Sequence, residues 1–132
     1  MLWNKSLEIG IPAIDDQHKE LFRQVDILLD NSKQDRVSQT LKFLGAYVKK
    51  HFSDEQMLHI KAKYPKAETH RKMHTDFVGA YVKMEKEYES DSANKLQVLL
   101  RINKTVVDWL KHHIMVQDKD FAAYYKSSNE KK

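Results

Sequence analysis

The sequence predicts an all-α protein, an antiparallel up-down-up-down four-helix bundle with an N-terminal arm. Two observations predict this fold class. Glycine and proline are scarce, at 3 and 2 of 132 residues, while long stretches are rich in residues that favour helix. Apolar residues also recur every three or four positions through four long segments, and short connections between such segments are typical of antiparallel neighbours. We expect a single domain over residues 1–132.

The N-terminal arm, residues 1–13, leads into the first predicted helix. Asp15 or Asp16 can cap this helix, which we expect to run through Leu29. Residues at helical spacing form its inner face: Ile14, His18, Leu21, Val25 and Leu28.

The second helix is predicted from about residue 36 to residue 63. Tyr64 ends it, because the residue before a proline avoids the helical conformation. Its seam alternates by three and four and includes two ionisable side chains: Leu41, Leu44, Val48, His51, Glu55 and Leu58. Gly45 lies within this helix and Gly79 within the next, and each glycine indicates a close approach between helices.

The third and fourth helices complete the bundle. The third covers about residues 66–89, Ser92 is available to cap the fourth, and a polar tail begins at about residue 127. The inner face of the third helix carries two further histidines: His70, Met73, His74, Phe77, Tyr81, Met84 and Tyr88. The seam of the fourth ends in another: Leu96, Leu99, Val106, Leu110 and His113.

Composition excludes several classes of protein. Without cysteine, the chain has neither disulfides nor thiolate metal sites. The net charge of +4 is spread among acids and forms no basic patch, so we expect no nucleic-acid partner. No run of 18 apolar residues occurs, and the start, MLWNKSLEIGIPAI, does not read as a secretory leader. We therefore expect no membrane insertion and a cytoplasmic location.

Ionisable groups interrupt all four predicted seams. A single buried histidine is most often a core imidazole satisfied by a carbonyl group, but several on converging faces indicate a metal cluster. Side chains four apart lie about 40° from one another around a helix, so His-x3-Glu and His-x3-His motifs converge. The candidates on the seams are His18, His51, Glu55, His70, His74 and His113.

Asp118 is a further candidate on the fourth helix. It lies five residues after His113, about 140° away on an ideal helix, so the helix should end or bulge between the two if both bind one cluster. Five histidines and two carboxylates exceed the four ligands of a structural zinc site and suit a pair of metal ions. Nitrogen and oxygen donors favour iron or manganese, and zinc stays open.

The ordered set of motifs resembles the hemerythrin family, in its single-domain bacterial form, bacteriohemerythrin. Four stretches carry the resemblance along nearly the whole chain: IGIPAIDDQHKELF, HFSDE, YPKAETHRKMHTDF and WLKHHIMVQDKDFAAY. The resemblance implies two iron ions joined by an oxo or hydroxo bridge. It assigns His70, His74 and His113 to one iron and His18 and His51 to the other, with Glu55 and Asp118 bridging.

The resemblance also implies a function. Dioxygen would bind reversibly at the position that the second iron leaves open, for oxygen carriage, storage or delivery, and the protein would not be an enzyme. An oxygen-consuming enzyme is a conceivable protein partner. Two other classes stay open: an oxygen or redox sensor or interaction module, and a di-iron enzyme that removes peroxide or nitric oxide or oxidises iron. Apolar residues match the family's dioxygen pocket, or are ordinary core: Phe52, Trp109, Leu110 and Ile114.

Two histidines lie outside the ligand set. His59 stands where family members usually carry methionine, a turn beyond Glu55. We expect its ring to reach solvent at the end of the bundle; the alternative is a polar group near the pocket or its entrance. His112 should lie on the surface.

Overall fold

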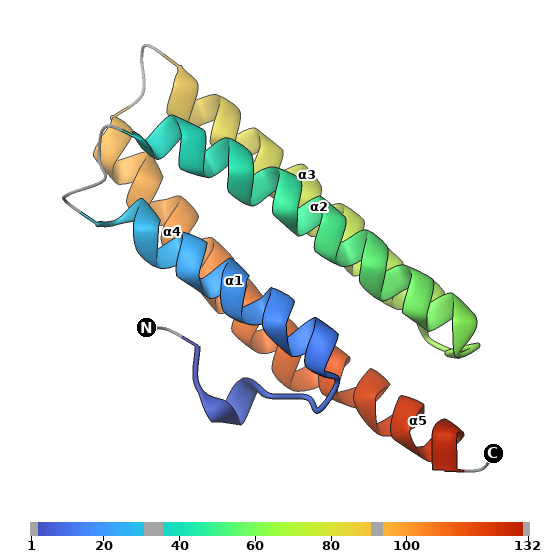
Figure 1. Ribbon diagram of the computed structural model, residues 1–132. Coiled ribbons are helices and arrows are strands. Elements are labelled where there is room, and N and C mark those ends of the chain that lie inside the picture. The colour runs from blue at the N-terminus through green and yellow to red at the C-terminus, as the bar shows by residue number, and fades with distance from the viewer. Residues whose placement is uncertain (1–2, 31–35, 91–93, 131–132) are drawn as a thin grey trace.

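The computed structural model describes residues 3–30, 36–90 and 94–130, and in these ranges every regular element is a helix (Figure 1). The elements are a short 3-10 helix η1 (Lys5–Leu7), α1 (Pro12–Leu28), α2 (Val37–Lys61), α3 (Ala67–Glu89), α4 (Lys95–His113), the π-helical turn η3 (Ile114–Asp118) and α5 (Lys119–Glu130). The predicted all-α fold class is confirmed. None of the described helices has the length and apolar composition needed to cross a bilayer.

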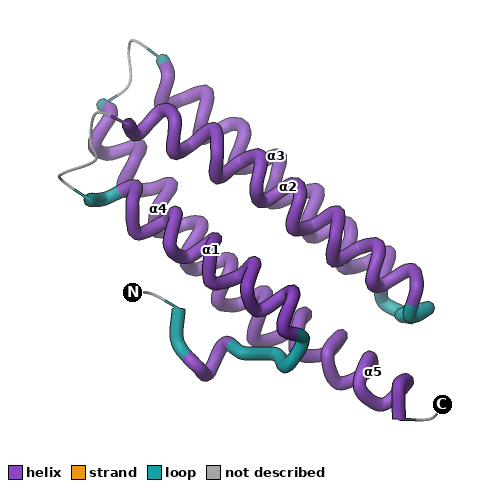
Figure 2. Tube along the Cα trace, in the orientation of Figure 1, coloured by secondary structure: helices purple, strands orange, loops and turns teal. Residues whose placement is uncertain are grey.

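Four helical rods form the bundle, and the fourth is the continuous run of α4, η3 and α5. Figure 1 shows α1 beside α4 and α2 beside α3, and contacts also join α1 to α2 and α3 to α4. Consecutive rods run in opposite directions, as predicted. Figure 2 shows that the described loops lie at the ends of the rods and along the arm. The middle of the bundle is therefore built from helix alone.

The start of α1 differs from the prediction, and so does the end of the arm. Pro12 occupies the first turn after Ile11, so the helix begins before Asp15, since the fixed φ of proline suits the first helical position. Asp15 does not cap the helix. Its buried carboxylate accepts hydrogen bonds from the backbone N–H of Ile9 at 2.8 Å and of Gly10 at 3.0 Å. Asp15 therefore fixes the turn that joins the arm to α1.

The other helix boundaries lie close to the predicted ones. The α2–α3 connection contains Lys63 at a φ of 55° and the Tyr64–Pro65 pair that ends the helical pattern. Ser92, the predicted cap of the fourth helix, lies outside the described residues; Asn94 caps α4, and its side chain accepts from the N–H of Gln97 at 3.1 Å. The expected polar tail is helical as far as Glu130.

The seams face one core, but the predictions for Leu96 and Gly79 are wrong. Leu96 is 62% exposed, because it lies in the first turn of α4, where few neighbouring side chains cover it, and burial starts at Val98 and Leu99. Gly79 has open space where a Cβ would stand, so it marks no close approach. At Gly45, in contrast, a Cβ would lie 3.0 Å from a ring carbon of Tyr81, so α2 and α3 do approach closely there.

Candidate metal centre

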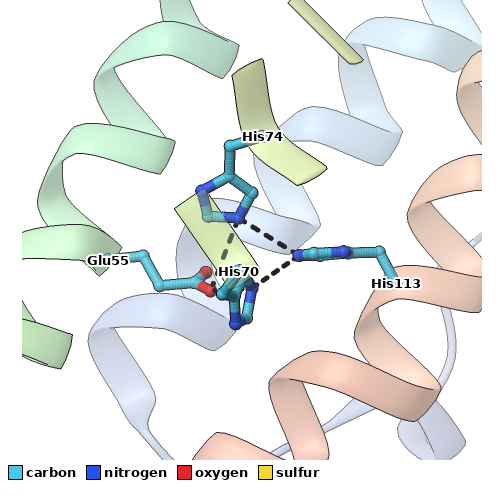
Figure 3. A group of neighbouring side chains, drawn as sticks. All are labelled: Glu55, His70, His74 and His113. Carbon is cyan, nitrogen blue, oxygen red and sulfur yellow. Dashed lines mark hydrogen bonds and ion pairs between the residues drawn. The ribbon is translucent and has the colours of Figure 1, made fainter. Parts of the chain in front are cut away.

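The structure brings seven predicted side chains together in the interior of the bundle. Every one of them is at most 3% exposed. They come from all four rods: His18 from α1, His51 and Glu55 from α2, His70 and His74 from α3, His113 from α4 and Asp118 from η3. Figure 3 shows four of them, Glu55, His70, His74 and His113, turned toward a common point between the helices.

A π-helical turn places the last two members of this set. The sequence predicts that the fourth helix ends or bulges between His113 and Asp118, and η3 spans Ile114–Asp118. Hydrogen bonds from residue i to i+5 widen this turn, so side chains five apart lie on the same side. Nε2 of His113 accordingly lies 3.5 Å from Oδ1 of Asp118. The predicted bulge is confirmed.

The side chains form two groups that share Glu55. In the first, the ligand atoms of Glu55, His70, His74 and His113 all lie within 4.8 Å of one another. Nε2 of His113 is 2.6 Å from Nε2 of His70 and 3.1 Å from Nε2 of His74. The second group combines Glu55 with His18 and His51. Three histidines therefore belong to one group and two to the other.

Each carboxylate turns one oxygen to each group. Oε1 of Glu55 is 2.9 Å from Nε2 of His70, and its Oε2 is 3.4 Å from Nε2 of His51. Asp118 repeats the pattern: Oδ1 is 3.0 Å from Nε2 of His70, and Oδ2 is 3.2 Å from Nε2 of His18. This is the arrangement required of two carboxylates that bridge a pair of cations.

The electrostatics of the chain alone are those of a cation site. Burial, and then the neighbouring Asp118, raises the pKa of Glu55 well above its ordinary value. Burial also acts to raise the pKa of Asp118, but the close imidazoles of His18 and His70 outweigh it and hold the pKa of that carboxyl well below its ordinary value. One of the two carboxyls thus favours its protonated form, because it is buried and because the other is charged. Cations between the two would reverse this preference and leave both ionised.

Three of the imidazoles, those of His51, His74 and His113, are in the neutral state that metal binding requires. Burial, and then neighbouring histidines, lower the pKa of His51 to about 3 and that of His74 to about 2. Burial also lowers the pKa of His113 to about 4, against the opposing influence of Asp118. Because a metal ion binds only unprotonated imidazole, these side chains have no proton to lose at neutral pH.

Unpartnered polar atoms also fit a pair of metal ions. Both nitrogens of His18 and all four carboxylate oxygens of Glu55 and Asp118 are buried without a hydrogen-bond partner among the described residues. Leaving such groups unsatisfied costs about 1–3 kcal/mol each, more when they are charged. Metal ligation would satisfy Nε2 of His18 and the four carboxylate oxygens together, with nitrogen and oxygen donors that suit iron.

Two glutamines orient ligand candidates, and neither was predicted from the sequence. Oε1 of Gln17 accepts from Nδ1 of His51 at 2.7 Å, and Nε2 of Gln17 donates to Asp54 at 2.9 Å, which fixes the direction of the amide. Oε1 of Gln56 lies 3.1 Å from Nδ1 of His74. In each case the proton resides on Nδ1, so that Nε2 presents its lone pair to the cluster. The only signal in the sequence was a glutamine adjacent to His18 and another adjacent to Glu55.

The predicted pocket residues are two aromatic rings that stack on histidines of the cluster and two buried aliphatic side chains. Phe52 stacks in parallel on His74 with ring centroids 3.8 Å apart, and Trp109 stacks on His113 at 4.3 Å. Leu110 and Ile114 are 1% and 0% exposed. The described walls around this part of the cluster are therefore aromatic and aliphatic.

The prediction that His59 reaches solvent is wrong. Its side chain is 1% exposed, because Phe121 of α5 and Tyr64 of the α2–α3 connection cover it, with ring centroids 4.3 Å and 5.2 Å away. Nε2 of His59 lies 3.5 Å from Oε1 of Glu55. Burial, and then the nearby His70, lower its pKa to about 4. His112 is exposed, as predicted.

Comparison with known proteins agrees with this geometry. The family model described as the Hemerythrin HHE cation binding domain matches residues 9–125. The chain belongs to the hemerythrin family. Hemerythrins bind oxygen at a di-iron centre, and the His/Glu cluster of this hemerythrin is able to hold metal ions.

Several hemerythrins are similar over most of this chain. The bacteriohemerythrin of Clostridium acetobutylicum is 30% identical over 128 residues, which cover 91% of this chain and 97% of that protein. The bacteriohemerythrin of Methylococcus capsulatus is 33% identical over 90% of this chain and 92% of its own length. The myohemerythrin of Theromyzon tessulatum is 28% identical over 88% and 86%.

Proposed function

We propose that this hemerythrin binds dioxygen reversibly at a non-heme, carboxylate-bridged di-iron site and serves in oxygen carriage, storage or delivery. One observation carries the proposal. Two buried groups of histidines share Glu55, and both Glu55 and Asp118 turn one oxygen toward each group. No single ion needs such a symmetrical pair of carboxylates, whereas two adjacent ions do.

The ligand assignment follows the two groups. His70, His74 and His113 would hold one iron, and His18 and His51 the other, with both carboxylates between them. Three histidines would thus serve the first iron and only two the second, so the second iron would have room for a further ligand. When bound, the iron pair supplies the electrons for reversible dioxygen binding.

The residues around the centre control access of water. Phe52, Leu110 and Ile114 are at most 4% exposed, and Trp109 covers the ring of His113. A dry wall favours release of dioxygen over irreversible oxidation, because water and protons assist the loss of reduced oxygen. We propose that these four side chains form the dioxygen pocket.

The test is anaerobic reconstitution with ferrous iron, followed by iron analysis and optical spectra through cycles of air and argon. Two irons per chain, with a visible charge-transfer band that appears in air and disappears under argon, are expected. Asp118→Asn should abolish this behaviour, while the matched change Asp76→Asn, at an exposed carboxylate of α3, should leave it intact. Two irons that oxidise at once to a stable ferric form would contradict oxygen carriage and favour a sensor or a redox enzyme.

We also propose a cellular location and a partner for this function. A chain without cysteine is suited to the cytoplasm, where thiols stay reduced and disulfides are rare. An oxygen-consuming enzyme would be the recipient of the delivered dioxygen. Oxygen uptake by such an enzyme, measured at low oxygen with and without this hemerythrin, tests delivery directly.

A further inference from the structure

His59 is a buried polar side chain next to the centre that the ligand assignment does not use. It is 1% exposed, and neither ring nitrogen has a hydrogen-bond partner among the described residues. The aromatic neighbours do not provide one: Phe121 has no polar atom, and the hydroxyl of Tyr64 donates to Asp120 and makes no hydrogen bond with His59. An imidazole of this kind is costly to bury unless something pairs with it.

The nearest acceptor belongs to the centre itself. Nε2 of His59 lies 3.5 Å from Oε1 of Glu55, and neither oxygen of Glu55 has a hydrogen-bond partner among the described residues. Nε2 of His70 lies 2.9 Å from the same oxygen, but in the proposed assignment that nitrogen would bind metal and carry no proton to donate. A carboxylate oxygen that binds a metal through one lone pair keeps another for a hydrogen bond. A donor without an acceptor thus faces an acceptor without a donor, a few tenths of an ångström beyond hydrogen-bond length.

The position of His59 argues against a role as an eighth metal ligand. Its ring lies 4.5 Å from the ring of His70, on the side of the group that already holds three histidines. In the proposed assignment the iron on that side would already be held by three histidines and two carboxylates. His59 can therefore act on the centre only through a ligand, and Glu55 is the ligand it faces.

We propose that His59 is a positioning residue of the di-iron centre, whose Nε2–H donates a hydrogen bond to Oε1 of Glu55. The inference rests on the proposed function, because it presupposes that Glu55 bridges two irons. The hydrogen bond has two effects. It holds the carboxylate in the bridging orientation, and it withdraws electron density from the carboxylate, which favours the reduced centre over the oxidised one.

The experiment compares wild type with three variants, all reconstituted with iron. His59→Met removes the donor and introduces an apolar side chain of adequate size, whereas His59→Gln keeps an N–H donor. His112→Met changes an exposed histidine and serves as the control. Spectroelectrochemistry measures the ratio of reduced to oxidised centre at a fixed potential. Infrared difference spectra between the two states report the carboxylate stretches, and circular dichroism checks folding.

For His59→Met we expect the ratio of reduced to oxidised centre to fall about tenfold, with shifted carboxylate bands. In His59→Gln the ratio and the carboxylate bands should return toward those of wild type, and in His112→Met neither the ratio nor the bands should change. Unchanged potential and bands in His59→Met, or equal shifts in His59→Met and His59→Gln, would overturn the positioning role while the wild type still binds two irons and oxygen. Failure of the wild type to bind two irons would overturn the proposed function as well.

A measurement on the wild type does not depend on the folding of any variant. In the zinc-loaded, diamagnetic protein, nitrogen-15 spectra of the histidine rings should show a slowly exchanging proton on Nε2 of His59. A proton on Nδ1 with a bare Nε2 would overturn the proposal, because the donor to Glu55 would then be missing.

Discussion

The buried histidines make the stability of the metal-free chain depend on pH, and acidification from pH 7 to pH 5 is the informative perturbation. Four histidines have pKa values lowered from 6.5 to about 4 or below: His51, His59, His74 and His113. At pH 5 they stay neutral in the folded chain and become protonated in the unfolded one. Because the unfolded state then binds more protons, stability falls as the pH falls through 6.5 toward the folded pKa values.

The magnitude follows from the difference in proton binding. Each of the four histidines stabilises the unfolded chain by about 2 kcal/mol between pH 7 and pH 5, or about 8 kcal/mol together. Glu55 acts in the opposite direction because its pKa is raised in the folded chain. Glu55 can take up at most one proton over these two pH units, which limits its offset to about 2.7 kcal/mol. We therefore expect a loss of about 5 kcal/mol, comparable with the whole stability of an ordinary domain.

The assay is urea denaturation of chelator-treated protein, followed by circular dichroism at pH 7, 6 and 5. His51→Gln removes one of the four histidines and should reduce the pH dependence by about 2 kcal/mol. A free energy of unfolding that changes by less than about 1 kcal/mol between pH 7 and pH 5 would refute the reasoning, because the histidines would then be protonated inside the folded chain.

Three further predictions concern single side chains. Glu55→Gln should lower iron from two ions per chain to one or none while helix content is kept, as iron analysis and circular dichroism can establish. Gln17→Leu should weaken metal binding about tenfold in competition with a chelator, because it frees the ring of His51. Gly10→Ala should lower the midpoint of thermal unfolding by an amount equivalent to about 1–2 kcal/mol, since φ is 86° and the new Cβ would meet the end of Lys126; an unchanged midpoint would contradict the expected strain at this residue.

The apolar periodicity of the sequence was sufficient to predict the four helical rods and the side chains that line their inner faces. Seams spaced by three and four identify which face of each helix is buried, and the six ionisable residues on those faces can meet only if the helices pack side by side. The π turn was also predictable, because His113 and Asp118 stand five apart and cannot both point inward from an ordinary helix. These inferences need only the geometry of one helix at a time.

The misses depend on contacts between segments that are distant in the sequence. Asp15 is a plausible cap by its position, but proline had already started the helix and the carboxylate was free to bind the arm. His59 is buried because α5 continues beyond the bundle centre and brings Phe121 over it. Gln17 orients a ring 34 residues away. No pattern within one helix reveals such pairings.

The π turn also sets the rotation of α5 about its own axis, and so determines which of its side chains face the core. Each residue of an α-helix advances the side chains by about 100°, so the extra residue that the turn accommodates rotates α5 by about that angle relative to an unbroken helix. Phe121 and Ala122 are 1% and 3% exposed in that rotated position. Deletion of one residue between Ile114 and Asp118 would turn Phe121 and Ala122 away from the core. It would also move the carboxylate of Asp118 away from the cluster. The same five residues therefore align a ligand candidate and seat the C-terminal helix, so neither can be changed alone.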